Sequence, residues 1–143
     1  MKLVFASDHA GLTLRRALME HAVSLGHDVV DLGPDTSDSV DYPDFANALA
    51  DALAKDPDAS GVAVCGTGIG ISIALNRHSH VRAALVSDVT TATLTRLHND
   101  ANVIAFGERV IGIETAKGAL SAFLTTDYEG GRHERRVAKL SPR

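Results

Sequence analysis

Cysteine and aromatic residues are scarce in this sequence. Its 143 residues include one cysteine, no tryptophan, two tyrosines and four phenylalanines. A single cysteine cannot form an intramolecular disulfide, so we expect a protein of a reducing compartment. With so few aromatic rings available, the core is expected to be aliphatic, built from alanine, valine, leucine and isoleucine.

An excess of basic charge and long apolar runs are also missing. Fourteen basic and eighteen acidic residues give a net charge of −4, which argues against a general nucleic-acid binder. No apolar run is long enough to span a membrane, and a strand pattern starts directly at the N-terminus, so no signal peptide is expected. We therefore expect a cytoplasmic protein without nucleic-acid or membrane partners.

Short apolar runs alternate with helical patterns along the chain. This alternation predicts an α/β fold, a doubly wound three-layer αβα sandwich with a five-stranded parallel sheet. The length suits one domain over 1–143 with a basic C-terminal helix at about 132–140. Strands are predicted at 3–6, 27–32, 61–65, 81–87 and 103–106, and helices at 12–25, from 41 to about 54, 71–76, 88–98 and 114–124.

A glycine turn follows the third predicted strand. The strand ends at Cys65, and Gly66, Gly68 and Gly70 alternate before a helix begins. Such a turn lets a ligand approach the backbone, and the free N–H groups of the helix start favour an anion. A thiol in this position can act as a base. The alternative is that the glycines only form a turn and that Cys65 is a small buried apolar residue without a chemical role. The glycine spacing matches neither the dinucleotide fingerprint nor a Walker loop.

Polar residues follow several of the other predicted strands. In parallel α/β folds the ligand lies beyond the carboxyl ends of the strands, near the switch in strand order. We therefore expect one edge of the sheet to carry the residues that follow strands one, three, four and five: Asp8, His9, Cys65, Ser87, Asp88 and Arg109.

The basic tail and the histidines allow two readings. Arg132 and Arg136 are four residues apart and share a helix face, which suits a phosphate, whereas Arg135 is out of phase. On spacing alone, a solvated basic end is favoured. Two of the seven histidines, His9 and His98, stand in polar turns. The pair at 78 and 80 lacks a third ligand, so no metal site is expected.

Five short motifs together resemble type B ribose-5-phosphate isomerases, whose wider family includes galactose-6-phosphate and allose-6-phosphate isomerases. The resemblance covers essentially the whole chain. The motifs are Ser7-Asp8-His9-Ala10-Gly11, Tyr42-Pro43, the segment from Cys65 to Ser72, the segment from His98 to Asn102, and the tail from Tyr128 to Arg136.

The resemblance implies a Rossmann-like fold, a homodimer or higher homo-oligomer with shared sites, no cofactor or metal, and a phosphorylated pentose as substrate. It implies interconversion of ribose 5-phosphate and ribulose 5-phosphate through ring opening and a cis-enediolate. Cys65 matches the base and His98 the ring-opening acid. One branch of the family instead carries a glutamate, at a position that is Ile71 here. The matched substrate contacts are Asp8, His9, Gly66, Thr67, Gly68, Ile69, Gly70, Asn99, Arg109, Arg132 and Arg136.

Two other functions remain open from the sequence. An isomerase of a hexose 6-phosphate would use the same chemistry in a larger pocket. A non-catalytic module that binds sugar phosphates or nucleotides could use the same scaffold, although binding alone needs neither Cys65 nor His98. Cofactor-independent isomerisation requires a base for a carbon-bound proton and donors for the enediolate oxygens, and the thiol and glycine turn could supply both.

Overall fold

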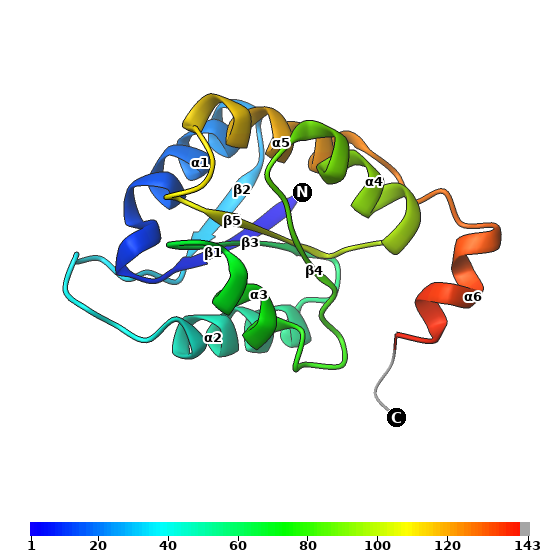
Figure 1. The fold of residues 1–143 in the computed structure, drawn as a ribbon, viewed down its shortest axis with the longest axis horizontal. Coiled ribbons are helices and arrows are strands. Elements are labelled where there is room, and N and C mark those ends of the chain that lie inside the picture. Colours follow the sequence, from blue (N-terminus) through cyan, green and yellow to red (C-terminus); the bar gives the residue numbers. More distant parts are fainter. Residues whose placement is uncertain (141–143) are drawn as a thin grey trace.

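The computed structural model describes residues 1–140 and has alternating strands and helices (Figure 1). The strands are β1 Lys2–Ser7, β2 Asp28–Asp31, β3 Ser60–Cys65, β4 Ala83–Leu85 and β5 Val103–Gly107. The helices are α1 Leu12–Ser24, α2 Tyr42–Lys55, α3 Ile69–Leu75, α4 Val89–Asn99, α5 Ile113–Thr125 and α6 Arg132–Ala138, with a 3₁₀ turn η1 His9–Gly11 before α1. No helix in residues 1–140 has the length and apolarity to cross a membrane.

All five strands are parallel, in the order β2-β1-β3-β5-β4. The direction of winding reverses between β1 and β3, because the chain moves outward from β1 to β2 and then returns to the other side. Ala6 pairs with Ala63 and Cys65 with Gly107, so the carboxyl ends of β1, β3 and β5 finish side by side. This is the switch point at which open α/β sheets bind ligands.

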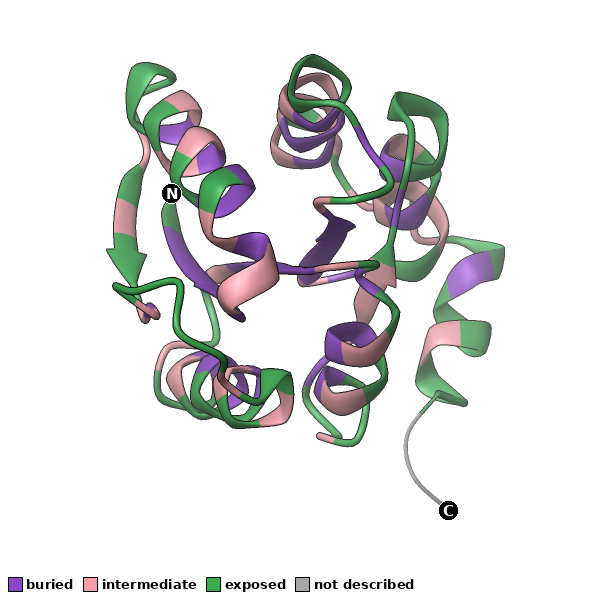
Figure 2. Ribbon diagram, turned by 60° about the vertical axis from the view of Figure 1, so that its left-hand side comes forward, coloured by how far each residue is buried: buried purple, intermediate pink, exposed green. Residues whose placement is uncertain are grey.

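Helices cover both faces of the sheet, which confirms the predicted three-layer arrangement (Figure 1). On one face α1, α4 and α5 bury a cluster that includes Phe5, Leu18 and Phe106, and on the other α2 and α3 bury Leu49 and Ile71. Figure 2 shows the buried positions on the sheet and on the inner sides of these helices. The core is aliphatic apart from Phe5, Phe106 and Phe123, as the composition predicted.

The element bounds differ from the predictions mainly at β4. The sequence predicted a strand over 81–87, but only Ala83–Leu85 forms it. The backbone N–H of Arg82 donates to the Asn102 side chain instead of a neighbouring strand, at 2.8 Å. β4 lies at the edge of the sheet, where Ala83 to Leu85 pair with Val103 to Ala105 of β5. The final helix ends at Ala138, and residues 141–143 lie outside the described part.

Helix α6 stands apart from the sandwich. Figures 1 and 2 show it beyond α4, at the margin of the molecule. His133 is its one buried residue, while the rest of the helix is half-buried or exposed. A seven-residue helix is too short to be stable by itself, so its position depends on contacts with the end of α4.

A buried arginine fixes the loop that follows β2. The Arg15 side chain is fully buried and donates to Ser7 Oγ and to the Pro34 carbonyl, both at 2.7 Å. Its Nε lies 3.1 Å from Asp31 Oδ1. Burial lowers the Arg15 pKa, and the Asp31 carboxylate opposes that shift. These contacts hold the loop against the carboxyl end of β1.

Candidate active site

The Cys65 thiol lies under the glycine turn at the carboxyl end of β3. Its Sγ accepts a hydrogen bond from the backbone N–H of Gly68 at 3.1 Å, and the residue is 4% exposed. An N–H pointing at sulfur stabilises the thiolate, which is the form that acts as a base. Thr67 and Ile69 are exposed on the turn, and the Thr67 hydroxyl accepts from Ile69 N at 3.2 Å.

Two of the turn's glycines have a steric reason to be glycine. Gly68 has a φ of +77°, and a Cβ there would overlap Leu85 and the backbone of Phe106. A Cβ on Gly70 would overlap the ring of Tyr42, the first residue of α2. The turn is therefore held between β5 and a tyrosine ring, with its peptide groups in a fixed orientation.

Arg109 and Glu108 lie beside the turn after β5. The backbone N–H groups of Glu108 and Arg109 donate to the carbonyls of Cys65 and Gly66, each at 3.0 Å. A Cβ on Gly66 would be 3.3 Å from Arg109 Nη1, so the guanidinium lies against this glycine. Burial raises the Glu108 pKa, hydrogen bonds from Leu14 and Thr13 oppose that shift, and the Asp8 charge adds to it.

Asp8 and His9 follow β1 at the same edge. Asp8 is buried, and its Oδ1 accepts from the backbone N–H groups of Ala10 and Gly11 at 2.9 and 3.1 Å. His9 Nδ1 accepts from the backbone N–H of Val40 at 3.1 Å. Since a backbone N–H can only donate, Nδ1 is the acceptor in this bond, which leaves Nε2 to carry the ring's N–H. That proton is free to meet an anion.

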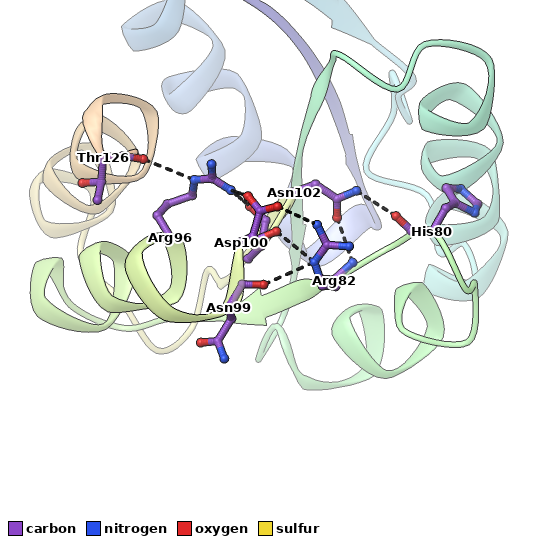
Figure 3. Close-up of polar contacts among 8 residues, drawn as sticks. His80, Arg82, Arg96, Asn99, Asp100, Asn102 and Thr126 are labelled. Atoms are coloured by element: carbon purple, nitrogen blue, oxygen red, sulfur yellow. Dashed lines mark hydrogen bonds and ion pairs between the residues drawn. The ribbon is translucent and has the colours of Figure 1, made fainter. Parts of the chain in front are cut away.

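His98 and Asn99 lie at the opposite edge of the sheet. Helix α4 starts after the carboxyl end of β4, and eleven residues carry it about 16 Å, to the amino ends of the strands. There the Asn99 carbonyl accepts from Arg82 Nε at 3.2 Å, one residue before β4 begins (Figure 3). Asn99 is exposed, and the His98 side chain is 38% exposed.

An ion-pair network fixes the end of α4 (Figure 3). Asp100 has a left-handed φ of +45° and pairs through separate carboxylate oxygens with Arg82 at 3.2 Å and Arg96 at 3.0 Å. Arg96 also donates to the Thr126 carbonyl at 3.3 Å, which ties the chain after α5 to α4. The network therefore holds His98 and the segment that leads to α6 as one unit.

The tail returns to His98. The Glu129 backbone N–H donates to the Leu97 carbonyl at 3.1 Å. The His133 ring stacks on that of His98, with ring centres 4.4 Å apart and planes 17° from parallel. Burial lowers the His133 pKa, and His98 lowers it further. Arg132 and Arg136 are exposed on α6, so both lie with His98 and Asn99, away from Cys65.

The structure thus divides the predicted site residues into two groups. The carboxyl-edge group is Asp8, His9, Cys65, Gly66, Thr67, Gly68, Ile69, Gly70 and Arg109, with Ser87 and Asp88 on the same edge. The amino-edge group is His98, Asn99, Arg132 and Arg136. Asp88 uses one carboxylate oxygen to cap α4, by accepting from Thr91 N at 2.7 Å.

Sequence reasoning missed three residues. Glu108 beside Asp8, and Glu129 and His133 beside His98, are all close to predicted site residues. Glu129 and His133 lie within a recognised motif and Glu108 follows the fifth strand, but nothing in the spacing singled them out. A cleft of about 440 Å³ lies at the amino edge and is lined by residues such as Arg82, Asn99 and Val137, so it does not contain Cys65.

A parallel sheet with helices on both faces and a thiol under a glycine turn at the switch point define a Rossmann-like α/β protein with a site for a small anionic ligand. Comparison with known proteins narrows this class. Residues 3–140 match the Ribose/Galactose Isomerase family. The chain belongs to this family of isomerases.

This chain aligns with its relatives over nearly the whole length of both proteins. Ribose-5-phosphate isomerase B of Escherichia coli strain K12 is 44% identical over 140 residues, which are 98% of this chain and 94% of that protein. The crystal structure of ribose 5-phosphate isomerase B from Thermotoga maritima has a TM-score of 0.95 at 40% identity, covering 98% of this chain and 97% of that one. The enzyme from Mycoplasma genitalium, solved with bound ribulose 5-phosphate, has a TM-score of 0.94 at 42% identity, covering 97% and 93%.

Proposed function

We propose that this protein interconverts D-ribose 5-phosphate and D-ribulose 5-phosphate. The observation that carries the proposal is the Cys65 thiol under the Gly68 N–H, at the switch point of the sheet. The names of the relatives agree, since one is called ribose-5-phosphate isomerase B and another was solved with ribulose 5-phosphate. We also propose a cytoplasmic location, which suits a chain with one buried, free cysteine.

The proposed reaction moves one proton between two carbons. His98 protonates the ring oxygen of the furanose, and the anomeric hydroxyl gives its proton to water as the ring opens to the aldehyde. The Cys65 thiolate takes the proton from C2, and the electron pair forms an enediolate with its charge on the oxygens. Backbone N–H groups of Gly66 to Gly70 stabilise that charge. A proton passes from O2 to O1 of the enediolate, and the Cys65 thiol returns its proton to C1, so that C2 becomes the carbonyl of the ketose and C1 carries the hydroxyl.

We propose that each site is shared between two chains of a homodimer. Cys65 and His98 lie at opposite edges of the sheet, so one chain cannot place both on the same sugar. An exposed apolar surface surrounds the glycine turn and would suit a partner chain. It comprises residues that are each at least 41% exposed and lie at or after the carboxyl ends of β3, β4 and β5: Ile69, Ile73, Leu85, Val89, Val110 and Ile113.

In that arrangement the phosphate meets donors from both chains. His9 presents its Nε2 proton at the carboxyl edge, and Arg109 lies next to Gly66. The Arg132 and Arg136 side chains of the second chain would complete the anchor, because α6 is exposed at the end of α4. Guanidinium groups match phosphate oxygens in pairs of hydrogen bonds.

Arg136→Ala is expected to weaken substrate binding by roughly 1.5–3 kcal/mol, the contribution of a charge-assisted hydrogen bond. The effect should appear mainly in KM, because the phosphate is held alike in ground and transition states. Arg135→Ala is the matched control, since Arg135 is equally exposed but lies off the face shared by Arg132 and Arg136. Equal, small effects of both substitutions would show that the basic helix is only solvated.

A panel of three substrates tests the proposed reaction. We expect turnover of ribose 5-phosphate at a kcat/KM well above those for allose 6-phosphate and galactose 6-phosphate. A preference for either hexose phosphate would replace the proposed substrate while keeping the chemistry. Binding of all three sugar phosphates without turnover would identify a sugar-phosphate-binding module and refute the proposed isomerase activity.

A further inference from the structure

Three side chains of the kinds that can ligate a metal ion meet at the end of α4. The cluster comprises His98, Glu129 and His133, and their ligand atoms all lie within 4.8 Å of one another. Glu129 Oε2 is 3.9 Å from His98 Nε2 and 3.6 Å from His133 Nε2. Both distances exceed those of a hydrogen bond, so the three groups face one another without bonding.

The buried residue of the cluster, His133, has a ring nitrogen that makes no hydrogen bond within residues 1–140. His133 is 5% exposed, and its Nε2 is buried without a hydrogen-bond partner among the described residues. A buried nitrogen without a partner is costly. Here that nitrogen points at a carboxylate that is itself half-exposed and able to move. A cation between them would satisfy both groups.

Two imidazole nitrogens and one carboxylate oxygen form a typical zinc ligand set. In a tetrahedral Zn²⁺ site with bonds of 2.0–2.1 Å, neighbouring ligand atoms are about 3.4 Å apart. The observed 3.6 and 3.9 Å exceed that separation only slightly. The stacked rings must turn toward a common point, and the His98 side chain, at 38% exposure, has the freedom to do so.

We propose that His98, Glu129 and His133 bind one Zn²⁺ ion per chain and that the bound ion inhibits the enzyme. The inhibitory half rests on the proposed function, in which His98 supplies the proton for ring opening. Zinc on Nε2 takes the lone pair of that nitrogen and holds the ring against Glu129. The fourth coordination position is left to water or to a substrate oxygen.

Zinc binding is measured on the full-length protein after dialysis against EDTA, by competition with a chromophoric zinc chelator. We expect one Zn²⁺ per chain, with an affinity that falls about tenfold or more in Glu129→Gln and in His133→Asn. His78→Asn is the control, because His78 is a half-buried histidine bonded to Asn47 Oδ1 at 2.8 Å, outside the cluster. Thermal unfolding of each zinc-free variant reports whether the variant is folded. Glu129→Gln should disturb the fold less than His133→Asn, because Glu129 is half-exposed and His133 is buried.

No binding by the wild type, or binding that neither cluster variant weakens, would overturn the site. Loss of binding in His78→Asn would assign the zinc to surface histidines instead. In the activity arm, stoichiometric zinc should remove ribose 5-phosphate turnover, and EDTA should restore it. Unchanged turnover with zinc bound would overturn the inhibitory half. A wild type inactive in EDTA on all three sugar phosphates would refute the proposed function, while the binding data would still decide the site.

Discussion

Cys65→Ala is expected to lower kcat for ribose 5-phosphate by about 10²–10⁴-fold, the contribution of a positioned general base. The substitution removes the Sγ that accepts from Gly68 N–H at the end of β3. Cys65→Ser should be similarly inactive, because a hydroxyl keeps the size of the group but is a far weaker base at neutral pH. The measurement is turnover together with exchange of the C1 proton of ribulose 5-phosphate in deuterated water.

The exchange assay separates the two proposed catalytic roles. Ribulose 5-phosphate cannot close a furanose ring, since the oxygen on its C5 is esterified, so its C1 proton is accessible without ring opening. His98→Asn should therefore lose turnover of ribose 5-phosphate but keep C1 exchange, whereas Cys65→Ala should lose both. Near wild-type exchange in Cys65→Ala, with unfolding temperature unchanged, would show that another group is the base.

The layers of the fold could be predicted from the sequence because each element carries a clear local pattern. Runs such as that ending at Cys65 are apolar throughout, as is typical of strands buried on both faces. Glycine stands where the backbone has a positive φ, as at Gly26 after α1 and Gly68 in the glycine turn, with values of 86° and 77°. The length of β4 could not be predicted, because its start depends on a contact between residues 20 apart in the sequence, the bond from Arg82 N–H to the Asn102 side chain.

The placement of the site was only half predictable. Residues that follow parallel strands must lie at the carboxyl edge, so Asp8, His9, Cys65 and Arg109 needed no structure to be grouped. The position of His98 follows from helix length, since an eleven-residue helix that begins at one edge ends at the other. The contacts of Glu129 and His133 with His98 depend on how the tail folds back, which hydrogen bonds at Leu97 and Thr126 determine.

The separation of Cys65 from His98 also changes how the site must be tested. Each of the two residues lies at an edge of the sheet that carries only part of the proposed site. The exposed apolar residues around the glycine turn and the projecting α6 are the two surfaces that a second chain would bring together. In a symmetric dimer each chain would supply the base of one site and the acid of the other.

Mixing two inactive variants tests the shared site most directly. Cys65→Ala and His98→Asn are combined in equal amounts under conditions in which differently tagged wild-type chains are shown to exchange. Random pairing makes half of the dimers hybrid, and each hybrid holds one intact site and one doubly altered site. A quarter of all sites are then intact, so we expect about a quarter of the wild-type turnover of ribose 5-phosphate. Cys65→Ala mixed with Cys65→Ser is the matched control and should stay inactive. Exchange of chains with no regained activity would contradict a site built from Cys65 of one chain and His98 of the other.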